Sequence, residues 1–272
     1  MQLDRTRIAI RERSFADVLD LALRVIRAHA LPLAATFAVG AVPMALFNHW
    51  MLAETLLDED LSQGVPWTYL FYSLFWIVWE LPLAAAPTTI YLGKALFEDK
   101  PSAASVAKDL LSSLPQLILF QVALRGVLTF FIITWPLLFV GWPYLNEILL
   151  LERNPWRKRG VYGASTGSRG SMMHARNHGE LLGRWLASVA VSIGLVLAIW
   201  GALLYLQTFI SFHSADAQVM YAIHLQVAVW IVISYFMVVR YLSYLDLRIR
   251  TEGWEIELTM RAEAARLTRQ LA

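Results

Sequence analysis

Three ionisable residues lie inside long apolar stretches and are the strongest candidates for chemistry in this sequence: Glu80, Arg125 and Glu147. A charge at the centre of a bilayer costs about 2.5–3.5 kcal/mol on insertion scales, so such a residue faces protein or water and marks a functional site by default. A buried polar clamp without transport or catalysis explains the same residues and is the preferred interpretation.

The other patterns that could do chemistry lack their structural context. Residues 163–167, GASTG, match the G-x-S-x-G pattern of α/β-hydrolases, but no strand precedes them. His174 and His178 have a spacing that can bind a metal on a helix, yet a solvated loop is the favoured interpretation. The chain has no cysteine, which excludes disulfides and thiolate chemistry. We therefore predict no catalytic, cofactor-binding or metal-binding residues and no enzymatic activity.

The amino-acid composition indicates which class of protein this chain belongs to. Of 272 residues, 58% are hydrophobic and 16% charged, against about 25% charged in a soluble domain. With 11 Trp, 13 Phe and 10 Tyr, a soluble chain of this length could not hide its apolar surface. The sequence predicts a membrane protein, and a net charge of +2 argues against nucleic-acid binding.

Six segments are long and apolar enough to cross a hydrocarbon core of about 30 Å. They are Leu31–Trp50, Tyr69–Leu92, Leu114–Trp135, Pro136–Leu151, Leu186–Ile210 and Val219–Leu245. The expected fold class is all-α, an integral membrane six-helix bundle. Because the fourth segment is short and follows the third directly, these two could instead form a re-entrant hairpin.

Basic residues predict the orientation of these spans. Of the 23 Lys and Arg, 22 fall on one side of the predicted membrane: before the first span, after the second, between the fourth and fifth, and from Arg240 near the end of the sixth onward. The charged residues of the opposite loops are all acidic, such as Glu54 and Asp216. The positive-inside rule then places both termini in the cytoplasm, which suits a bacterial inner membrane.

The predicted domains are an N-terminal helix at the membrane interface (1–30), a six-span domain (31–250) with a basic cytoplasmic loop (152–185), and a cytoplasmic C-terminal helix (251–272). In the first of these, Ser14 and Asp17 suit an N-cap and first turn. Apolar residues from Phe15 to Ile26 then recur at helical spacing, which predicts an amphipathic helix that bends into the bilayer at Leu31-Pro32.

Two patterns concern how the spans pack. Similar segments begin at Tyr91, Tyr144 and Tyr241 and suggest a threefold unit of interfacial helix, outward span and inward span, although interfacial residue preferences alone could produce them. In the fifth span, small residues recur every four positions and predict close helix packing; they are Ala190, Gly194, Ala198 and Ala202.

Glu80 and Arg125 are expected to form a buried ion pair. Each lies 11 residues along its predicted span, about 16 Å from its own interface and near the middle of the bilayer. Glu147 is the competing partner, nearer the cytoplasmic side.

The two ends of the chain resemble a known family. Residues 14–43, SFADVLDLALRVIRAHALPLAATFAVGAVP, look like the start of the bacterial family named for the glycerophosphodiester phosphodiesterase membrane domain, and residues 244–267, YLDLRIRTEGWEIELTMRAEAARL, look like the ending of its polytopic relatives. The resemblance implies a six-helix membrane domain. The soluble catalytic barrel of some members has no counterpart here, so hydrolase activity is not implied. Relatives encoded beside AAA-type ATPases imply an accessory role.

The expected function is that of a non-enzymatic accessory or scaffold subunit, which lies in the lipid bilayer and binds partner proteins at its basic cytoplasmic face. The alternative is a transporter or channel for a small solute or lipid that uses Glu80 and Arg125. An intramembrane hydrolase ranks third, because no nucleophile and base are found together. No cofactor and no nucleic-acid partner are expected.

Reporter fusions test the predicted orientation. Fusions after Ser62 and Ala215 should report a periplasmic location, and fusions after Gly167 and Ala272 a cytoplasmic one, because the basic loops stay inside. Alkaline phosphatase and green fluorescent protein activities measure this, and a periplasmic signal after Gly167 would contradict the six-span topology.

Overall fold

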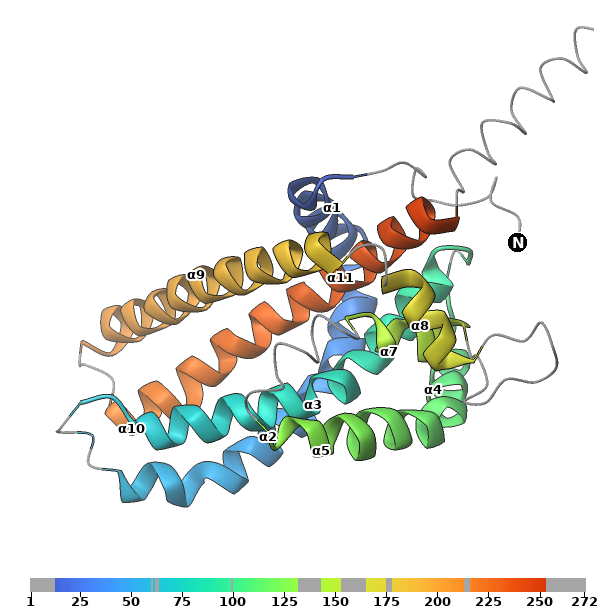
Figure 1. Cartoon of the computed structure of the whole chain (residues 1–272). Helices are drawn as coiled ribbons and strands as arrows, with labels where there is room; N and C mark the ends of the chain where they lie inside the picture. Colours follow the sequence, from blue (N-terminus) through green and yellow to red (C-terminus); the bar gives the residue numbers. More distant parts are fainter. Residues whose placement is uncertain are drawn as a thin grey trace, which may run out of the picture.

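The computed structural model describes residues 13–59, 61, 64–98, 100–131, 143–152, 165–174, 178–212 and 216–252. These residues form helices joined by turns, and no strand occurs among them. In chain order the helices are α1 (Phe15–Ala28), α2 (Ala30–Asp58), α3 (Trp67–Ala95), α4 (Ala103–Leu117), η3 (Ile118–Leu124), α5 (Arg125–Thr129), α7 (Leu145–Glu147), η5 (Ile148–Glu152), α8 (Thr166–His174), α9 (His178–Ser211), α10 (Ala217–Val219), η6 (Met220–Leu225) and α11 (Gln226–Glu252), where η denotes a π-helix (Figure 1).

Five helical stretches of the described chain are long and apolar enough to cross a membrane. They are Ala30–Asp58, Trp67–Ala95, Ala103–Thr129, His178–Ser211 and Ala217–Glu252. These match five of the six predicted spans, and all begin earlier than predicted; the third ends at Thr129, before the predicted end at Trp135, while the other four also end later. Of the remaining span, Pro136–Leu151, residues 136–142 lie outside the described residues, and the described part consists mainly of α7 and η5. The predicted C-terminal helix also lies almost wholly outside them.

The N-terminal helix begins where the sequence predicts. The Ser14 side chain accepts a hydrogen bond from the backbone N–H of Asp17, whose carboxylate accepts one from the backbone N–H of Ser14, so α1 starts with a capping box. Val18 and Ala22 are fully buried against α11, and the Tyr235 hydroxyl donates to the Leu19 carbonyl at 3.0 Å. The apolar face of α1 therefore packs on α11, the last helix of the described chain, whereas the predicted position at the lipid interface stays a prediction.

Two prolines lie inside helices. The chain turns at His29, not at Leu31-Pro32 as predicted, since Pro32 lies in the first turn of α2, where its missing N–H costs nothing. Pro115 lies inside α4, which continues through η3 into α5 as one stretch. The helix that contains the third predicted span therefore begins before Leu114, at Ala103.

The three predicted Tyr-Leu segments lie in two neighbouring apolar clusters. Tyr91, Tyr144 and Tyr241 are all buried, and the Tyr241 hydroxyl donates to the Leu92 carbonyl at 3.1 Å. Tyr91 and Tyr241 belong to the cluster in which α1, α3, η5 and α11 meet, whereas Tyr144 packs with Tyr244 in a second cluster, and Leu151 contacts both. A short helix followed by two long ones occurs as α1, α2 and α3 and again as α8, α9 and α11, while the threefold repeat itself stays a prediction.

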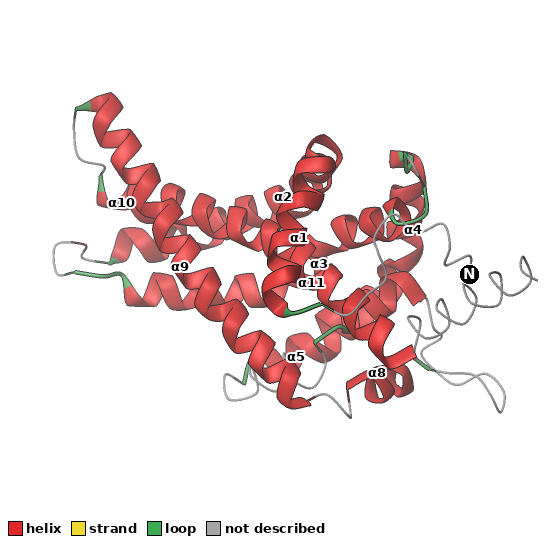
Figure 2. Cartoon of the chain, turned by 90° about the horizontal axis from the view of Figure 1, so that it is seen from above, coloured by secondary structure: helices red, strands yellow, loops and turns green. Residues whose placement is uncertain are grey.

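Helices α2 and α3 approach each other so closely at Gly40 that no side chain larger than that of glycine fits between them. A Cβ atom added at Gly40 would overlap the carbonyl oxygen of Ala84. By contrast, α9 lies along the outside of the bundle beside α11 and η6 (Figures 1 and 2).

Substitution of Gly40 tests this contact. Gly40→Ala should lower the free energy of unfolding in detergent by about 1–3 kcal/mol, because the added methyl group forces two backbones apart. Gly201→Ala in α9 is the matched control, since its Cβ would meet nothing within 4 Å and alanine favours helix. Equal melting temperatures of the two variants would contradict the close contact.

Candidate functional site

The three intramembrane candidates are all buried within the chain. Glu80 of α3 is 2% exposed, Arg125 at the start of α5 is 6% exposed, and Glu147 at the end of α7 is 1% exposed. The structure brings Arg125 and Glu147 into one cluster and leaves Glu80 in another.

The first cluster is centred on an ion pair between α7 and α11. Arg240 donates from Nε to Glu147 Oε1 at 2.7 Å and from Nη2 to Oε2 at 3.2 Å, a bidentate geometry. The charges of both residues act on Arg125, whose Nη1 donates to Gln121 Oε1 at 3.4 Å. Two arginines and one glutamate thus share a core site. Arg240 was not selected from the sequence, although it interrupts an apolar run as Arg125 does.

The predicted Glu80–Arg125 ion pair is wrong. Glu80 Oε2 accepts a hydrogen bond from Asn48 Nδ2 of α2 at 2.9 Å, and Asn48 is itself 1% exposed. The prediction compared the depths of Glu80 and Arg125 in the bilayer, and equal depth does not determine which face of its helix each residue occupies. The helix directly before Arg125 is the π-helical η3, whose i→i+5 hydrogen bonds change the facing of the residues after it relative to a regular α-helix.

Each π-helical segment of the described chain adjoins buried polar residues. The η3 segment contains Gln121 and ends before Arg125, and η5 begins directly after Glu147. The third, η6, ends before Gln226, whose Nε2 donates to Ser73 Oγ at 2.6 Å. Such π-turns occur frequently at functional sites. Neither they nor Gln226 were predicted, since no residue pattern identifies a π-turn.

A second set of charges lies at the end of the bundle that carries the basic residues. Arg169 of α8 donates from Nε to Glu152 Oε2 at 2.7 Å and also pairs with Glu252. Tyr244 donates its hydroxyl proton to Glu152 at 2.8 Å, and Arg248 binds Glu252 at 3.0 Å. Burial alone would raise the pKa of Glu152, but hydrogen bonds from Arg169 and Tyr244 and the charges of Arg169 and Arg248 outweigh it, so that the pKa is lowered.

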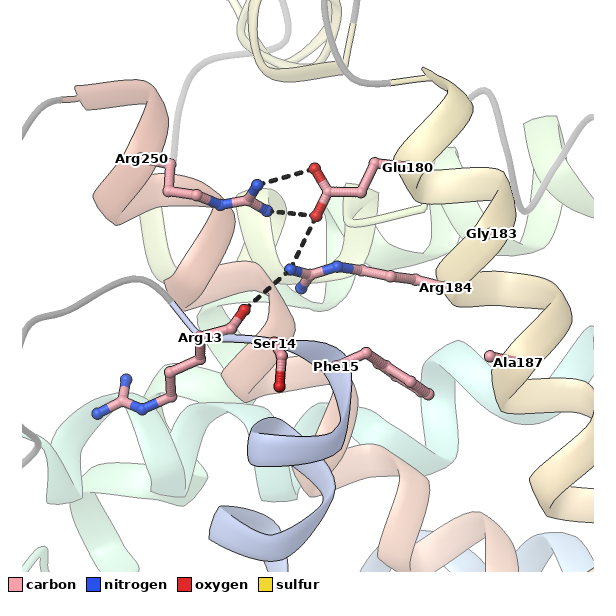
Figure 3. A pocket seen from close by; sticks show the side chains of 8 residues that line it. All are labelled: Arg13, Ser14, Phe15, Glu180, Gly183, Arg184, Ala187 and Arg250. Carbon is pink, nitrogen blue, oxygen red and sulfur yellow. Dashed lines mark hydrogen bonds and ion pairs between the residues drawn. The ribbon is translucent and has the colours of Figure 1, made fainter.

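A neighbouring network ties the first residues of the described chain to α9 and α11. The backbone N–H of Arg13 donates to Asp246 Oδ1 at 2.9 Å, and Arg184 Nη2 lies 2.7 Å from Asp246 Oδ2. Arg250 donates to both oxygens of Glu180, at 2.8 and 2.9 Å. These residues border an open cavity of about 550 Å³ (Figure 3). It is lined by Arg13, Ser14, Phe15, Glu180, Gly183, Arg184, Ala187 and Arg250.

These ion pairs bear on the prediction that partner proteins bind at the basic cytoplasmic face. Four of its arginines in the described chain, Arg169, Arg184, Arg248 and Arg250, bind carboxylates of the same chain. Each buried or half-buried positive charge is thereby neutralised internally. The arginines join α8, α9 and α11 to each other and to η5, so their first role is structural.

The predicted packing of the small-residue stripe is wrong for the described chain. Ala190, Gly194, Ala198 and Ala202 are all exposed, and a Cβ at Gly194 would meet nothing within 4 Å. Helix α9 packs with its other side on α11 and η6. A period of four places small residues on one face of a helix, but it does not say which face has a neighbour.

The G-x-S-x-G match and the pair of histidines noted in the sequence both lie at helix ends. Ser165 directly precedes α8, and its hydroxyl donates to Ser168 Oγ at 3.2 Å, as expected of a residue at a helix start. His174 ends α8 and His178 begins α9, so the two histidines do not share one helix.

Substitutions in the first cluster test whether it acts as a unit. Glu147→Gln should cost about 3–5 kcal/mol of unfolding free energy, because it leaves the buried Arg125 and the half-buried Arg240 without a nearby carboxylate. Arg240→Gln should cost less, since the charge of Arg125 remains and the Arg240 side chain is 22% exposed. The double variant should lose less than the sum of the two.

Detergent unfolding measured by circular dichroism gives these energies. Arg24→Gln is the control, because its pair with Asp20 lies on the surface and should contribute no more than about 1 kcal/mol. Additive losses in the double variant would contradict a coupled cluster.

The chain has no match among protein-family models, curated proteins or solved structures. The resemblance of its two ends to the glycerophosphodiester phosphodiesterase membrane domain therefore stays a prediction. Function must be inferred from geometry.

Proposed function

We propose that the chain is a non-enzymatic accessory or scaffold subunit of the bacterial inner membrane, with both termini in the cytoplasm, and that it binds a transmembrane helix of a partner protein along α9. The five apolar stretches support the membrane location. The exposed face of α9 is the observation that carries the proposal.

Helix α9 is the most apolar of the five candidate spans and the least covered by its own chain. No residue is buried in the most apolar stretch of this helix. Ile193 and Leu197 are each 56% exposed.

The exposed face also has the shape that membrane helices use for association. Large residues such as Ile193 and Leu197 form a ridge at a spacing of four, next to a groove formed by Gly194 and Ala198. Small residues let two backbones approach closely, and close packing drives association in lipid, where hydrophobic burial adds nothing. This face therefore suits a second membrane helix better than fluid lipid.

The basic end of the molecule has a supporting part in the proposal. Arg27, Lys100 and Lys108 are exposed there, and such residues bind anionic headgroups. Because the four arginines named above bind carboxylates of the same chain, partner recognition is assigned to α9 and not to the whole basic face.

The alternative, a transporter that uses Glu80 and Arg125, has less support. These residues belong to different clusters, and the cavity of about 550 Å³ is lined by neither. Transport requires a water-filled path to a buried polar group, so the scaffold is preferred.

Cysteine cross-linking tests the proposal directly, because the natural chain has no cysteine. In native membranes, Ala198→Cys should form a cross-link to one specific partner, which mass spectrometry identifies. Leu46→Cys, on the exposed face of α2, is the control and should give none. Gly194→Leu should abolish the cross-link without lowering the melting temperature of the isolated chain, since its Cβ meets nothing within 4 Å.

Two results would contradict the proposal. A lowered melting temperature of isolated Gly194→Leu would mean that the face packs within the chain. A cross-link to a second copy of the chain alone would indicate a homo-oligomer in place of an accessory subunit.

A further inference from the structure

The Asn48–Glu80 pair contains two buried oxygens that receive no hydrogen bond. Glu80 Oε2 accepts from Asn48 Nδ2 at 2.9 Å, whereas Glu80 Oε1 and Asn48 Oδ1 are both buried without a donor. An amide oxygen and an ionised carboxylate oxygen are both acceptors only. A single hydrogen between them would supply the missing donor.

Among the described residues, no positive charge pairs with a carboxylate at this position. The interactions of Glu80 in the described chain are with Asn48, which is neutral. Around α3, the charges of Arg125, Glu147 and Arg240 act on one another in the other cluster.

The remaining charged groups near α3 are also engaged elsewhere or face outward. Lys94 of α3 pairs with Asp109 of α4 at 2.8 Å, and Glu152 of η5 binds Arg169. His49, which follows Asn48, is exposed. An ionised Glu80 would therefore be a buried charge with one hydrogen bond and no counter-ion, and such a group is neutralised in preference to being buried charged.

We propose that Glu80 is a proton-binding site in the helix core. The proton resides on Oε1 and is donated to Asn48 Oδ1, while Oε2 accepts from Asn48 Nδ2. The acid and the amide are then joined by two hydrogen bonds in a ring, and each of the four polar groups has a partner. A divalent cation suits the site less well, because it needs six or more oxygen ligands and the pair offers two.

The bound proton would help to hold together α2 and α3. Asn48 belongs to α2 and Glu80 to α3, and the same two helices also meet at Gly40 and Ala84. Loss of the proton leaves a negative charge on a side chain that is 2% exposed, between these two helices. The pair is then stable when protonated and weakened as the pH rises.

Infrared spectroscopy of the full chain in detergent tests the proposal. At mildly acidic pH, the difference spectrum of wild type minus Glu80→Gln should contain the carbonyl band of a protonated carboxyl group, and carboxylate bands should replace it as the pH rises. Glu147→Gln is the matched control and should remove carboxylate bands instead, because Arg240 binds that residue. Carboxylate bands from Glu80 at mildly acidic pH would overturn the proposal.

A second variant keeps the test independent of the first. Asn48→Ala removes the amide, so the protonated carboxyl band should shift as its hydrogen bond is lost. A spectrum without such a shift would overturn the ring geometry.

Thermal stability gives a further readout. Glu80→Gln should melt within about 2 °C of wild type at mildly acidic pH, because the glutamine amide can make both hydrogen bonds of the neutral acid. Glu80→Leu, which can make neither, should melt clearly lower. Equal destabilisation by glutamine and leucine would contradict a neutral Glu80.

Discussion

The Glu147–Arg240 ion pair joins the segment before the basic loop to the last helix, and the polar core is organised around it. Hydrocarbon supplies no hydrogen bonds, so a polar side chain in a helix of this hydropathy must find its partner in the protein. Glu147 binds Arg240 through both oxygens, and Arg125 lies within reach of their charges. The positions of α5, α7 and α11 relative to one another are constrained by these contacts.

Polar groups elsewhere follow the same rule. At the far end of α11, Gln226 donates to the hydroxyls of Ser73 and Tyr69. At the opposite end, carboxylates and arginines of η5, α8, α9 and α11 bind each other. Each long helix pair is therefore fixed by a few polar contacts in an otherwise apolar surface, which specify register where apolar side chains alone would allow sliding.

Hydropathy predicted five of the long helices because length and apolarity are properties of one segment. The prediction failed where a property depends on a neighbour or on the helix type. The third span is predicted to begin at Leu114, whereas its helix begins at Ala103, and Glu80 and Arg125 lie with different partners although their predicted depths are equal. The partner of Glu80 is Asn48, a residue that the sequence gives little reason to select.

The stripe of small residues on α9 shows most clearly what a sequence pattern cannot predict. The spacing of Ala190, Gly194, Ala198 and Ala202 correctly places four small residues on one side of a helix. Which side faces the bundle depends on the other helices, and here it is the opposite one. A contact surface can thus be read from one chain, whereas its occupant cannot.

The contact between α1 and α11 has a consequence for the order of folding. Val18 and Ala22 pack on the last described helix, and the backbone N–H of Arg13 donates to Asp246, 233 residues later in the chain. During synthesis from the N-terminus, α1 is made long before its docking surface. Until α11 emerges, the apolar face of α1 must be covered by lipid or by a chaperone, because the surface on which it packs does not yet exist. This early helix is therefore among the last of the described elements to reach its native position.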